Sequence, residues 1–297
     1  MAILAFMLAA SVGSVACVIA VALQPAFRCN DQWPQWSPDG RAIVFTSDRT
    51  GDPEVFVLDL GARTPRQLTH TPGRDAHPSF APDGHRIAFQ SPRGDGHTNL
   101  YTMKRDGSDP RKITAHHGFA GVPVWSPDGA TIAYQWTPKL QAENWRLMLL
   151  DVASGRTEQI TDGTANDQVP NWGPDGRLIF YSDRTGRNQL YVRAGNGTVQ
   201  QLTRTSSDDR GAAWSPDGRH IAFTSDRDGS PAGIYLMNVD GSAPRRLGTI
   251  APEHGVPFFS PDGSRVLVTP MVDGGQSIWS LSVKDGNHEV LSTCSRQ

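Results

Sequence analysis

The chain has almost no net charge and few cysteines, and it lacks the common catalytic motifs. Its 297 residues carry 28 Lys and Arg against 30 Asp and Glu, a formal net charge of −2. A balance this even excludes nucleic acid or anionic membrane as a partner held by bulk charge. After residue 26 there is no G-x-S-x-G, H-E-x-x-H, Walker loop or C-x-x-C. No residue is therefore predicted to be catalytic.

The first 26 residues differ from the rest of the chain. Residues 1–23, MAILAFMLAASVGSVACVIAVAL, contain no charged side chain. A run of this length is typical of a secretory signal or a membrane anchor, although the positive residues that usually precede a signal are missing. A lipoprotein site at Cys17 is a third interpretation. We predict a signal peptide or anchor over residues 1–26 and export of residues 27–297 to the periplasm or another extracytoplasmic compartment.

A seven-residue phrase, PQWSPDG at residues 34–40, recurs along the chain. Counted by the Asp of each PDG turn, the copies lie at Asp39, Asp83, Asp128, Asp175, Asp217 and Asp262, which are 42–47 residues apart. Repeats of this length with strand-like content indicate propeller blades of four strands. Amphipathic helical runs are absent after residue 26. The sequence therefore predicts an all-β fold, a six-bladed β-propeller with four antiparallel strands per blade.

Each repeat has four strand-like phases joined by turns. The first strand ends in an aromatic residue, the SPDG turn follows, and a buried apolar strand such as AIVFTS comes next. A turn such as DRTG leads to the third strand, and a second turn, often Asp-Gly, leads to a short fourth strand. We expect the aromatic residues to fill the wedges between blades rather than to stack on a ligand. They are Trp36, Phe80, Trp125, Trp172, Trp214 and Phe259.

This repeat resembles that of TolB-like propellers, which also occurs in the propellers of dipeptidyl-peptidase and prolyl-oligopeptidase enzymes. The pattern PxWSPDGxxIAFxSxRxGxxxIYxMxxDGxxxRxLT covers about residues 30–292. Those peptidases carry their catalytic triad on a separate α/β-hydrolase domain, and TolB carries a small α/β domain before its propeller. We expect the resemblance to concern the propeller alone.

Cys29 and Cys294 stand at the two ends of the repeat array. In register, Cys29 corresponds to Gly73 and Cys294 to Thr71, two residues apart in one inter-blade loop. Overlaying the chain ends on that loop brings the cysteines within disulfide reach, about 4.4–6.8 Å between Cα atoms. We predict a Cys29–Cys294 disulfide that closes the ring and fits an exported protein. Two free thiols are the alternative.

Acidic residues recur three positions before the Pro of each phrase. These positions hold Asp31, Asp75, Ala120, Asp167, Asp209 and His254. In a propeller the chain enters each inner strand from the face that carries the DRTG turns and the inter-blade links, here called the link face; the SPDG turns lie on the opposite, SPDG face. The four carboxylates and His254 are thus predicted to ring the channel mouth and to bind a cation, such as calcium, or a ligand. Alternatively, each Asp caps its own turn.

Histidines and two tryptophans are also predicted on the link face. His77, His116, His117 and His254 either hold a transition metal, as channel histidines do in oligogalacturonate lyases of similar repeat, or are solvated. Trp136 and Trp145 flank a longer turn in the third repeat and form either a partner contact or blade packing. The Asp-Arg pairs at 48–49, 183–184 and 226–227 are expected to form turns and ion pairs.

The leading functional hypothesis is a non-catalytic, monomeric exported propeller that binds a protein, peptide or glycan partner through the channel mouth. It would meet a membrane only through an uncleaved N-terminal segment. A metal-dependent hydrolase or lyase working in the mouth is the alternative, and a purely structural assembly module is the third. Fold-level analogy supports the first hypothesis.

Overall fold

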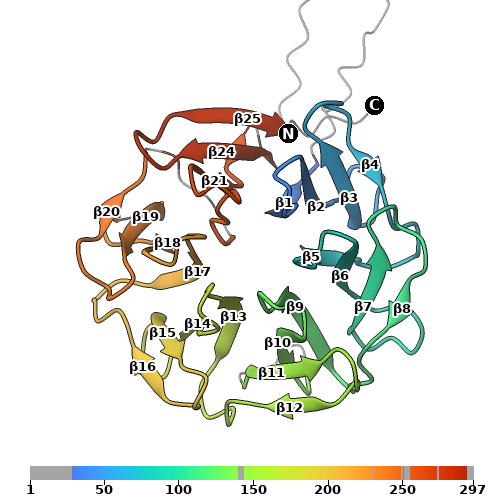
Figure 1. Cartoon of the computed structure of the whole chain (residues 1–297), viewed down its shortest axis with the longest axis horizontal. Helices are drawn as coiled ribbons and strands as arrows, with labels where there is room; N and C mark the ends of the chain where they lie inside the picture. The colour runs from blue at the N-terminus through green and yellow to red at the C-terminus, as the bar shows by residue number, and fades with distance from the viewer. Residues whose placement is uncertain are drawn as a thin grey trace, which may run out of the picture.

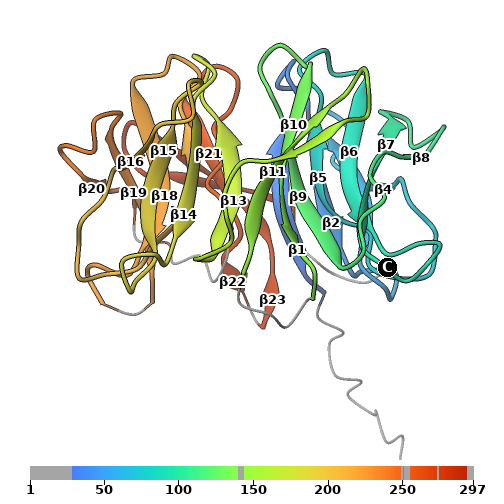
Figure 2. The same ribbon diagram turned by 90° about the horizontal axis from the view of Figure 1, so that it is seen from below.

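The fold is a ring of six small β-sheets around a common axis, as the sequence predicted (Figure 1). The computed structural model describes residues 29–139, 144–229, 231–248, 250, 255–272 and 274–292. The described residues contain strands and turns and no helix. Seen edge-on, the sheets stand side by side with their strands running between the two faces of the ring (Figure 2).

The first three blades each contain four antiparallel strands. Blade 1 comprises β1 (Asp31–Trp36), β2 (Ala42–Ser47), β3 (Glu54–Asp59) and β4 (Arg66–Gln67). Blade 2 comprises β5 (Ala76–Phe80), β6 (Arg86–Ser91), β7 (Asn99–Lys104) and β8 (Arg111–Lys112). Blade 3 comprises β9 (Phe119–Trp125), β10 (Thr131–Thr137), β11 (Arg146–Asp151) and β12 (Thr157–Gln159).

The pattern continues in the second half of the ring, with a variation in the last blade. Blade 4 comprises β13 (Asp167–Trp172), β14 (Leu178–Ser182), β15 (Gln189–Arg193) and β16 (Val199–Gln201). Blade 5 comprises β17 (Asp209–Trp214), β18 (His220–Ser225), β19 (Gly233–Asn238) and β20 (Arg245–Arg246). Blade 6 comprises β21 (Arg265–Val268), β24 (Ile278–Ser282) and β25 (His288–Ser292), with a small extra hairpin of β22 (Met271–Val272) and β23 (Gly275–Gln276). Its innermost segment pairs with β21 through a single bridge, Phe259 to Val266.

The core lies between neighbouring blades because each sheet buries both of its faces. Every residue of β2 is buried, and Val44 and Val57 of blade 1 pack in one cluster with Phe80 and Phe89 of blade 2. This double burial explains why the second and third strands of each blade are continuous runs of apolar residues and do not alternate between apolar and polar residues. The aromatic residues fill these wedges as expected: Trp214 is 5% exposed, and it packs with Ile179 of the preceding blade.

The repeated SPDG phrase builds a turn that also locks neighbouring blades together. In each such turn the Asp side chain accepts a backbone N–H two residues on, as Asp39 does from Arg41 at 3.0 Å. The Pro of one turn then lies against the Gly of the next blade's turn, so that a Cβ added at Gly129 would lie 3.2 Å from Pro82. The same contact joins Pro38 to Gly84, Pro174 to Gly218, Pro216 to Gly263 and Pro261 to Gly40. The last pair spans the seam between blades 6 and 1.

The two ends of the array meet at that seam. Ser292 of β25 donates a hydrogen bond to Asp31 of β1, and Asn30 forms a parallel bridge with Gln276 of β23. Cys29 is fully buried two residues before Asp31, whereas Cys294 lies outside the described residues. The Cys29–Cys294 disulfide therefore stays a prediction.

The predicted signal or anchor over residues 1–26 also lies outside the part of the chain that the structure describes. Within that part, no helix has the length and apolar character that crossing a membrane requires.

Candidate binding site at the channel mouth

Four of the predicted site residues form buried ion pairs inside their own blades. Asp31, Asp75, Asp167 and Asp209 are each fully buried, and each carboxylate binds the Arg that follows the second strand of the same blade. The four pairs are Asp31–Arg49 at 2.8 Å, Asp75–Arg93, Asp167–Arg184 at 2.7 Å and Asp209–Arg227 at 3.0 Å.

Each arginine in these pairs is held on three sides. In blade 5, Arg227 donates from Nε to Ser225 Oγ at 3.0 Å, and its guanidinium lies 4.9 Å from the ring centroid of Phe223 and 4.8 Å from that of Tyr235. Blades 1, 2 and 4 repeat the arrangement. The Asp, the Ser, the Arg and the two rings form one unit, here called the clasp, which ties the inner three strands of a blade together.

The clasp gives each of these carboxylates an arginine partner within its own blade, whereas we expected them to converge as a ring at the channel mouth. Their binding of a cation or ligand stays a prediction. At least one oxygen of each carboxylate binds the arginine of its own blade, while Asp75 Oδ1 and Asp167 Oδ2 have no hydrogen-bond partner among the described residues. Among the described residues, no group of three or more His, Cys, Asp or Glu side chains is placed to hold a metal ion. His254, the remaining member of the predicted ring, lies outside the described residues.

A signal for the clasp is present in the sequence. The blades with an Asp in this position, blades 1, 2, 4 and 5, also carry Ser-x-Arg after the second strand: Ser47-Asp48-Arg49, Ser91-Pro92-Arg93, Ser182-Asp183-Arg184 and Ser225-Asp226-Arg227. Blade 3, with Ala120, lacks this triplet, and so does blade 6. Comparison of the repeats with one another would have paired each Asp with its Arg.

The channel is narrowed two residues further along each inner strand. Trp33, His77, Val122 and Val169 occupy this position with φ values of 52° to 55°, and Gly211 has 46°. Positive φ strains any non-glycine residue and a β-branched one most, and such strain is frequent at functional sites. The preceding blade fixes the conformation, since the Val169 N–H donates to Gln135 Oε1 at 3.0 Å and the His77 N–H to Thr46 Oγ1 at 3.0 Å.

Blade 5 contributes only a glycine, Gly211, to this ring at the link-face end of the channel. A cavity of about 620 Å³ lies there, among blades 4, 5 and 6, with Trp33 of blade 1 in its wall. Gly211 approaches blade 6 so closely that a Cβ would lie 2.7 Å from the Gly255 carbonyl oxygen. Val169, Val256 and Tyr181 add apolar surface, and Asp183, Asp208, Asp226 and Arg210 add charge.

The acidic groups of this cavity include an unusual pair in blade 5. In blades 1 and 4, the Asp of the Asp-Arg pair accepts two hydrogen bonds from an Asn, as Asp183 does from Asn166 N at 2.9 Å and Nδ2 at 2.7 Å. In blade 5 the position that corresponds to Asn166 is occupied by Asp208. Its N–H still donates to Asp226 at 2.8 Å, but a carboxylate replaces the amide that would have bound the second oxygen. Three carboxylates against one guanidinium give the lining a net charge of −2.

The other predicted contact residues divide into two groups. His77 lies in the channel with its ring centroid 4.2 Å from that of Trp33, and burial lowers its pKa to about 3. His116, His117 and Trp136 gather at the link-face end of blade 3: the Trp136 indole N–H donates to the His117 carbonyl at 3.1 Å, and His116 Nε2 lies 2.6 Å from the Tyr134 hydroxyl. Trp145 packs edge-on against Phe119. His116, Trp136 and Trp145 thus contact residues of blade 3, whereas the His117 side chain is exposed and lies 3.2 Å from His97 Nε2.

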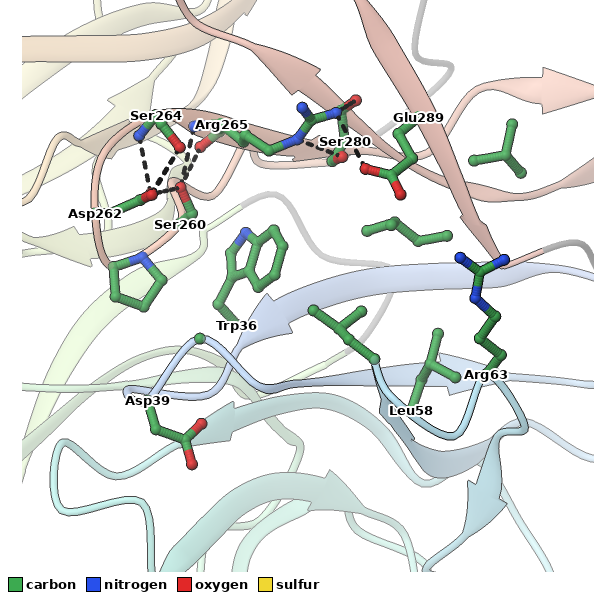
Figure 3. A pocket seen from close by; sticks show the side chains of 15 residues that line it. Trp36, Asp39, Leu58, Arg63, Ser260, Asp262, Ser264, Arg265, Ser280 and Glu289 are labelled. Carbon is green, nitrogen blue, oxygen red and sulfur yellow. Dashed lines mark hydrogen bonds and ion pairs between the residues drawn. The ribbon is translucent and has the colours of Figure 1, made fainter.

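A further cavity of about 490 Å³ follows the seam between blades 6 and 1 (Figure 3). Trp36 and Leu58 form its apolar side. On its polar side Arg265 donates to Ser280 Oγ at 2.7 Å and lies 3.7 Å from the Glu289 carboxylate. Since these polar groups are paired with one another, we assign this cavity to ring closure.

Comparison with known proteins agrees with this architecture. The model of the TolB beta propeller domain matches residues 24–139, 112–200 and 191–297, which together cover nearly the whole chain. The chain belongs to the TolB β-propeller domain family. The resemblance inferred from the repeats is thereby confirmed.

Relatives of this TolB-type propeller include one solved structure of similar extent. The structure of a putative TolB from Agrobacterium tumefaciens is 25% identical with a TM-score of 0.67, over 78% of this chain and 87% of that one. An uncharacterized protein, Atu1656, of Agrobacterium fabrum is 28% identical over 50% of this chain and 53% of its own length. The Tol-Pal system protein TolB of Francisella tularensis is 38% identical over 24% of this chain and 16% of its own. The chain thus matches about half or less of these curated relatives.

Proposed function

We propose that this TolB-type propeller is an exported binding protein that holds a positively charged segment of a protein partner in its link-face cavity. The observation that carries the proposal is the cavity of about 620 Å³ that combines Trp33 with the carboxylates of Asp183, Asp208 and Asp226. Ligand sites usually have volumes of about 300–1,000 Å³, and this cavity lies within that range. The relationship to a Tol-Pal system protein supports a partner in the cell envelope and export of the chain.

The charge of the cavity determines the kind of partner segment. Arg210 already binds Asp208 at 3.0 Å, so the open carboxylate surface belongs to Asp226 and Asp183. A lysine or arginine side chain would bind these oxygens and lie near the Trp33 ring, where cation–π attraction adds to the ion pair. The clasp carboxylates cannot serve this purpose because each is already bound to an arginine.

The alternative function, a metal-dependent hydrolase or lyase, depended on the ring of carboxylates at the mouth. The structure distributes those carboxylates among separate clasps, so partner binding is the function that the geometry favours.

Affinity capture from an envelope extract tests the proposal. The wild-type propeller is compared with Asp226→Asn and Asp183→Asn, and with Asp48→Asn as the matched control, because Asp48 holds the same position in blade 1 and does not line the cavity. We expect one partner to be retained by the wild type and the control, and lost from both cavity variants and at high salt. Equal retention by all four proteins would refute the proposed site.

A further inference from the structure

A groove between blades 2 and 3 has the opposite charge to the link-face cavity. It lies between β8, the outer strand of blade 2, and the turn that follows β11 of blade 3 (Figure 1). Its volume is about 410 Å³, which is within the usual range of ligand sites. Arg86, Arg111 and Lys112 are among the described residues that line it, and that lining contains no Asp or Glu. Trp125 and Val152 add apolar surface to this groove, here called the rim groove.

The apolar surface of the rim groove includes a side chain whose counterparts in other blades are packed. Val152 follows the third strand of its blade, where its N–H donates to the Ala130 carbonyl at 3.0 Å. Leu60, Val239 and Val283 hold the same position in blades 1, 5 and 6, and each packs on a core cluster. Val152 is 40% exposed and belongs to no core cluster of the described residues. Its side chain is therefore open to contact with a ligand.

Arg111 differs from the arginines that hold the same position in blades 1 and 5. Those arginines bridge to the next blade, since Arg66 donates to a backbone carbonyl of blade 2 at 3.0 Å and Arg245 to one of blade 6 at 2.8 Å. Arg111 instead turns back within its own blade and donates from Nε to Asp109 Oδ1 at 2.9 Å. Its side chain is 66% exposed and does not bridge the rim groove, so the groove stays accessible on the side of β8.

The guanidinium groups of Arg86 and Arg111 have donors available for a ligand. Both lie beside the single carboxylate of Asp109, which is 2.9 Å from Arg111 and 3.5 Å from Arg86. Two positive charges therefore face one negative charge, whereas Lys112 is paired with Asp95 at 3.2 Å. A guanidinium has five N–H donors and can bind a carboxylate through two of them, so most of these donors remain for the oxygens of a ligand.

We propose that the rim groove binds an acidic segment of a protein partner in which carboxylates flank an apolar side chain. The apolar side chain packs on Val152 and Trp125, and the carboxylates bind Arg86 and Arg111. Ser154 and its turn lie beside Val152 in the lining, so the groove suits one apolar side chain and not a long acyl chain. The rim groove shares no lining residue with the link-face cavity, so this proposal does not depend on the basic segment proposed there.

Calorimetric titration of the full chain at low ionic strength tests the inference. The probes are two acetylated and amidated pentapeptides, EDLDE and EDFDE, beside the basic pentapeptide KKLKK, dodecanoate and inorganic phosphate. We expect at least one acidic pentapeptide to bind saturably to one site per chain, and more weakly as salt is added. Arg86→Gln and Arg111→Gln should each weaken this binding about three- to tenfold, because each removes a charged donor. Val152→Asp should weaken it too, since it places a like charge beside the ligand.

Arg245→Gln is the matched control, because Arg245 holds the position of Arg111 in blade 5 and does not line the rim groove. It should leave the peptide affinity within about twofold. The inference is overturned if neither acidic pentapeptide binds saturably, if KKLKK binds as tightly, or if Arg245→Gln weakens binding as much as Arg111→Gln. Binding of dodecanoate or phosphate without the peptides would assign the groove to a lipid or a simple anion and overturn it as well. Loss of peptide binding in Asp226→Asn would place the peptide at the link face, with the same consequence.

Discussion

Removal of the Asp209 carboxylate should destabilise the propeller strongly, because it leaves a buried arginine unpaired. Asp209 is fully buried, and the Arg227 side chain is 18% exposed. Breaking a buried ion pair by deleting one partner costs about 3–5 kcal/mol. Arg227 keeps its bond to Ser225 and its contacts with Phe223 and Tyr235, so the lower end of that range applies. We expect Asp209→Ala to lower the free energy of unfolding by about 3 kcal/mol.

The double variant Asp209→Leu with Arg227→Met separates the charge from the packing. It removes both ions and fills their space with apolar atoms, so no unpaired charge remains buried. Such replacements are often neutral or stabilising in other proteins, although here the two cation–π contacts of about 1 kcal/mol each are lost. We expect the double variant to be more stable than Asp209→Ala alone, which is the opposite of additive behaviour.

Urea unfolding followed by tryptophan fluorescence and by circular dichroism measures these differences. A loss of about 3 kcal/mol corresponds to a fall in Tm of roughly 6–12 °C for a chain of this size. Arg210→Met is the matched control, since Arg210 in the same blade is 51% exposed and its pair with Asp208 lies at the surface. Such a pair contributes about 0–1 kcal/mol. If Asp209→Ala is as stable as Arg210→Met and loses partner binding, Asp209 is a binding residue and the structural role of the clasp is refuted.

Two further outcomes follow from single residues. Burial raises the pKa of Glu54 to about 7; the nearby Asp75 carboxylate also raises it, and a hydrogen bond from Thr69 lowers it. Because the pKa of Glu54 is higher in the folded state than in the unfolded state, the free energy of unfolding falls as pH rises from about 4.5 to 7. Glu54→Gln should thus raise Tm at pH 8 and change it little at pH 4, and an equal effect at both values would contradict this cause. If the predicted Cys29–Cys294 disulfide is present, its reduction should lower Tm. The chain-entropy model sets an upper limit of about 5 kcal/mol on the accompanying loss of the free energy of unfolding. Alkylation of two thiols in the unreduced, exported protein, detected by intact mass, would exclude the bridge.

The arrangement of Ser292 and Asp31 supports that disulfide independently of the register argument. Cys29 precedes Asp31 by two residues and Cys294 follows Ser292 by two, and the side chains of Asp31 and Ser292 are hydrogen-bonded to each other. A bridge in this place would add a covalent link to the Ser292–Asp31 hydrogen bond and the Asn30–Gln276 β-bridge, which join the first and last blades.

The fold was predictable because its determinants are local and recur in every repeat. The SPDG turns, the apolar second and third strands and the aromatic wedges each depend on residues within one blade or its neighbour. The expected turn and ion-pair role of the Asp-Arg pairs is confirmed for Arg49, Arg184 and Arg227. The same recurrence misled the interpretation of the aspartates, since repetition around a ring suggests convergence on the axis, whereas each Asp31-type carboxylate turns into its own sheet.

The link-face cavity could not be predicted, because it arises from differences between blades and not from the repeat. In blade 5 a single glycine, Gly211, stands where the other blades carry larger side chains, and a single exchange of Asn for Asp at position 208 changes the charge of the cavity. Neither residue stands out in the sequence, where glycine and aspartate are common. Their effect depends on which blades adjoin them across the channel.

The two ends of the channel therefore differ because different positions of the repeat line them. At the SPDG face five blades supply an aromatic residue and four supply a proline of the SPDG turn, and the described residues that line this end carry no charge. At the link face the corresponding positions hold Trp33, His77, Val122, Val169, Gly211 and Val256, and no two neighbouring blades offer the same chemistry except the valines of blades 3 and 4. Specificity for an irregular protein segment requires that kind of asymmetry.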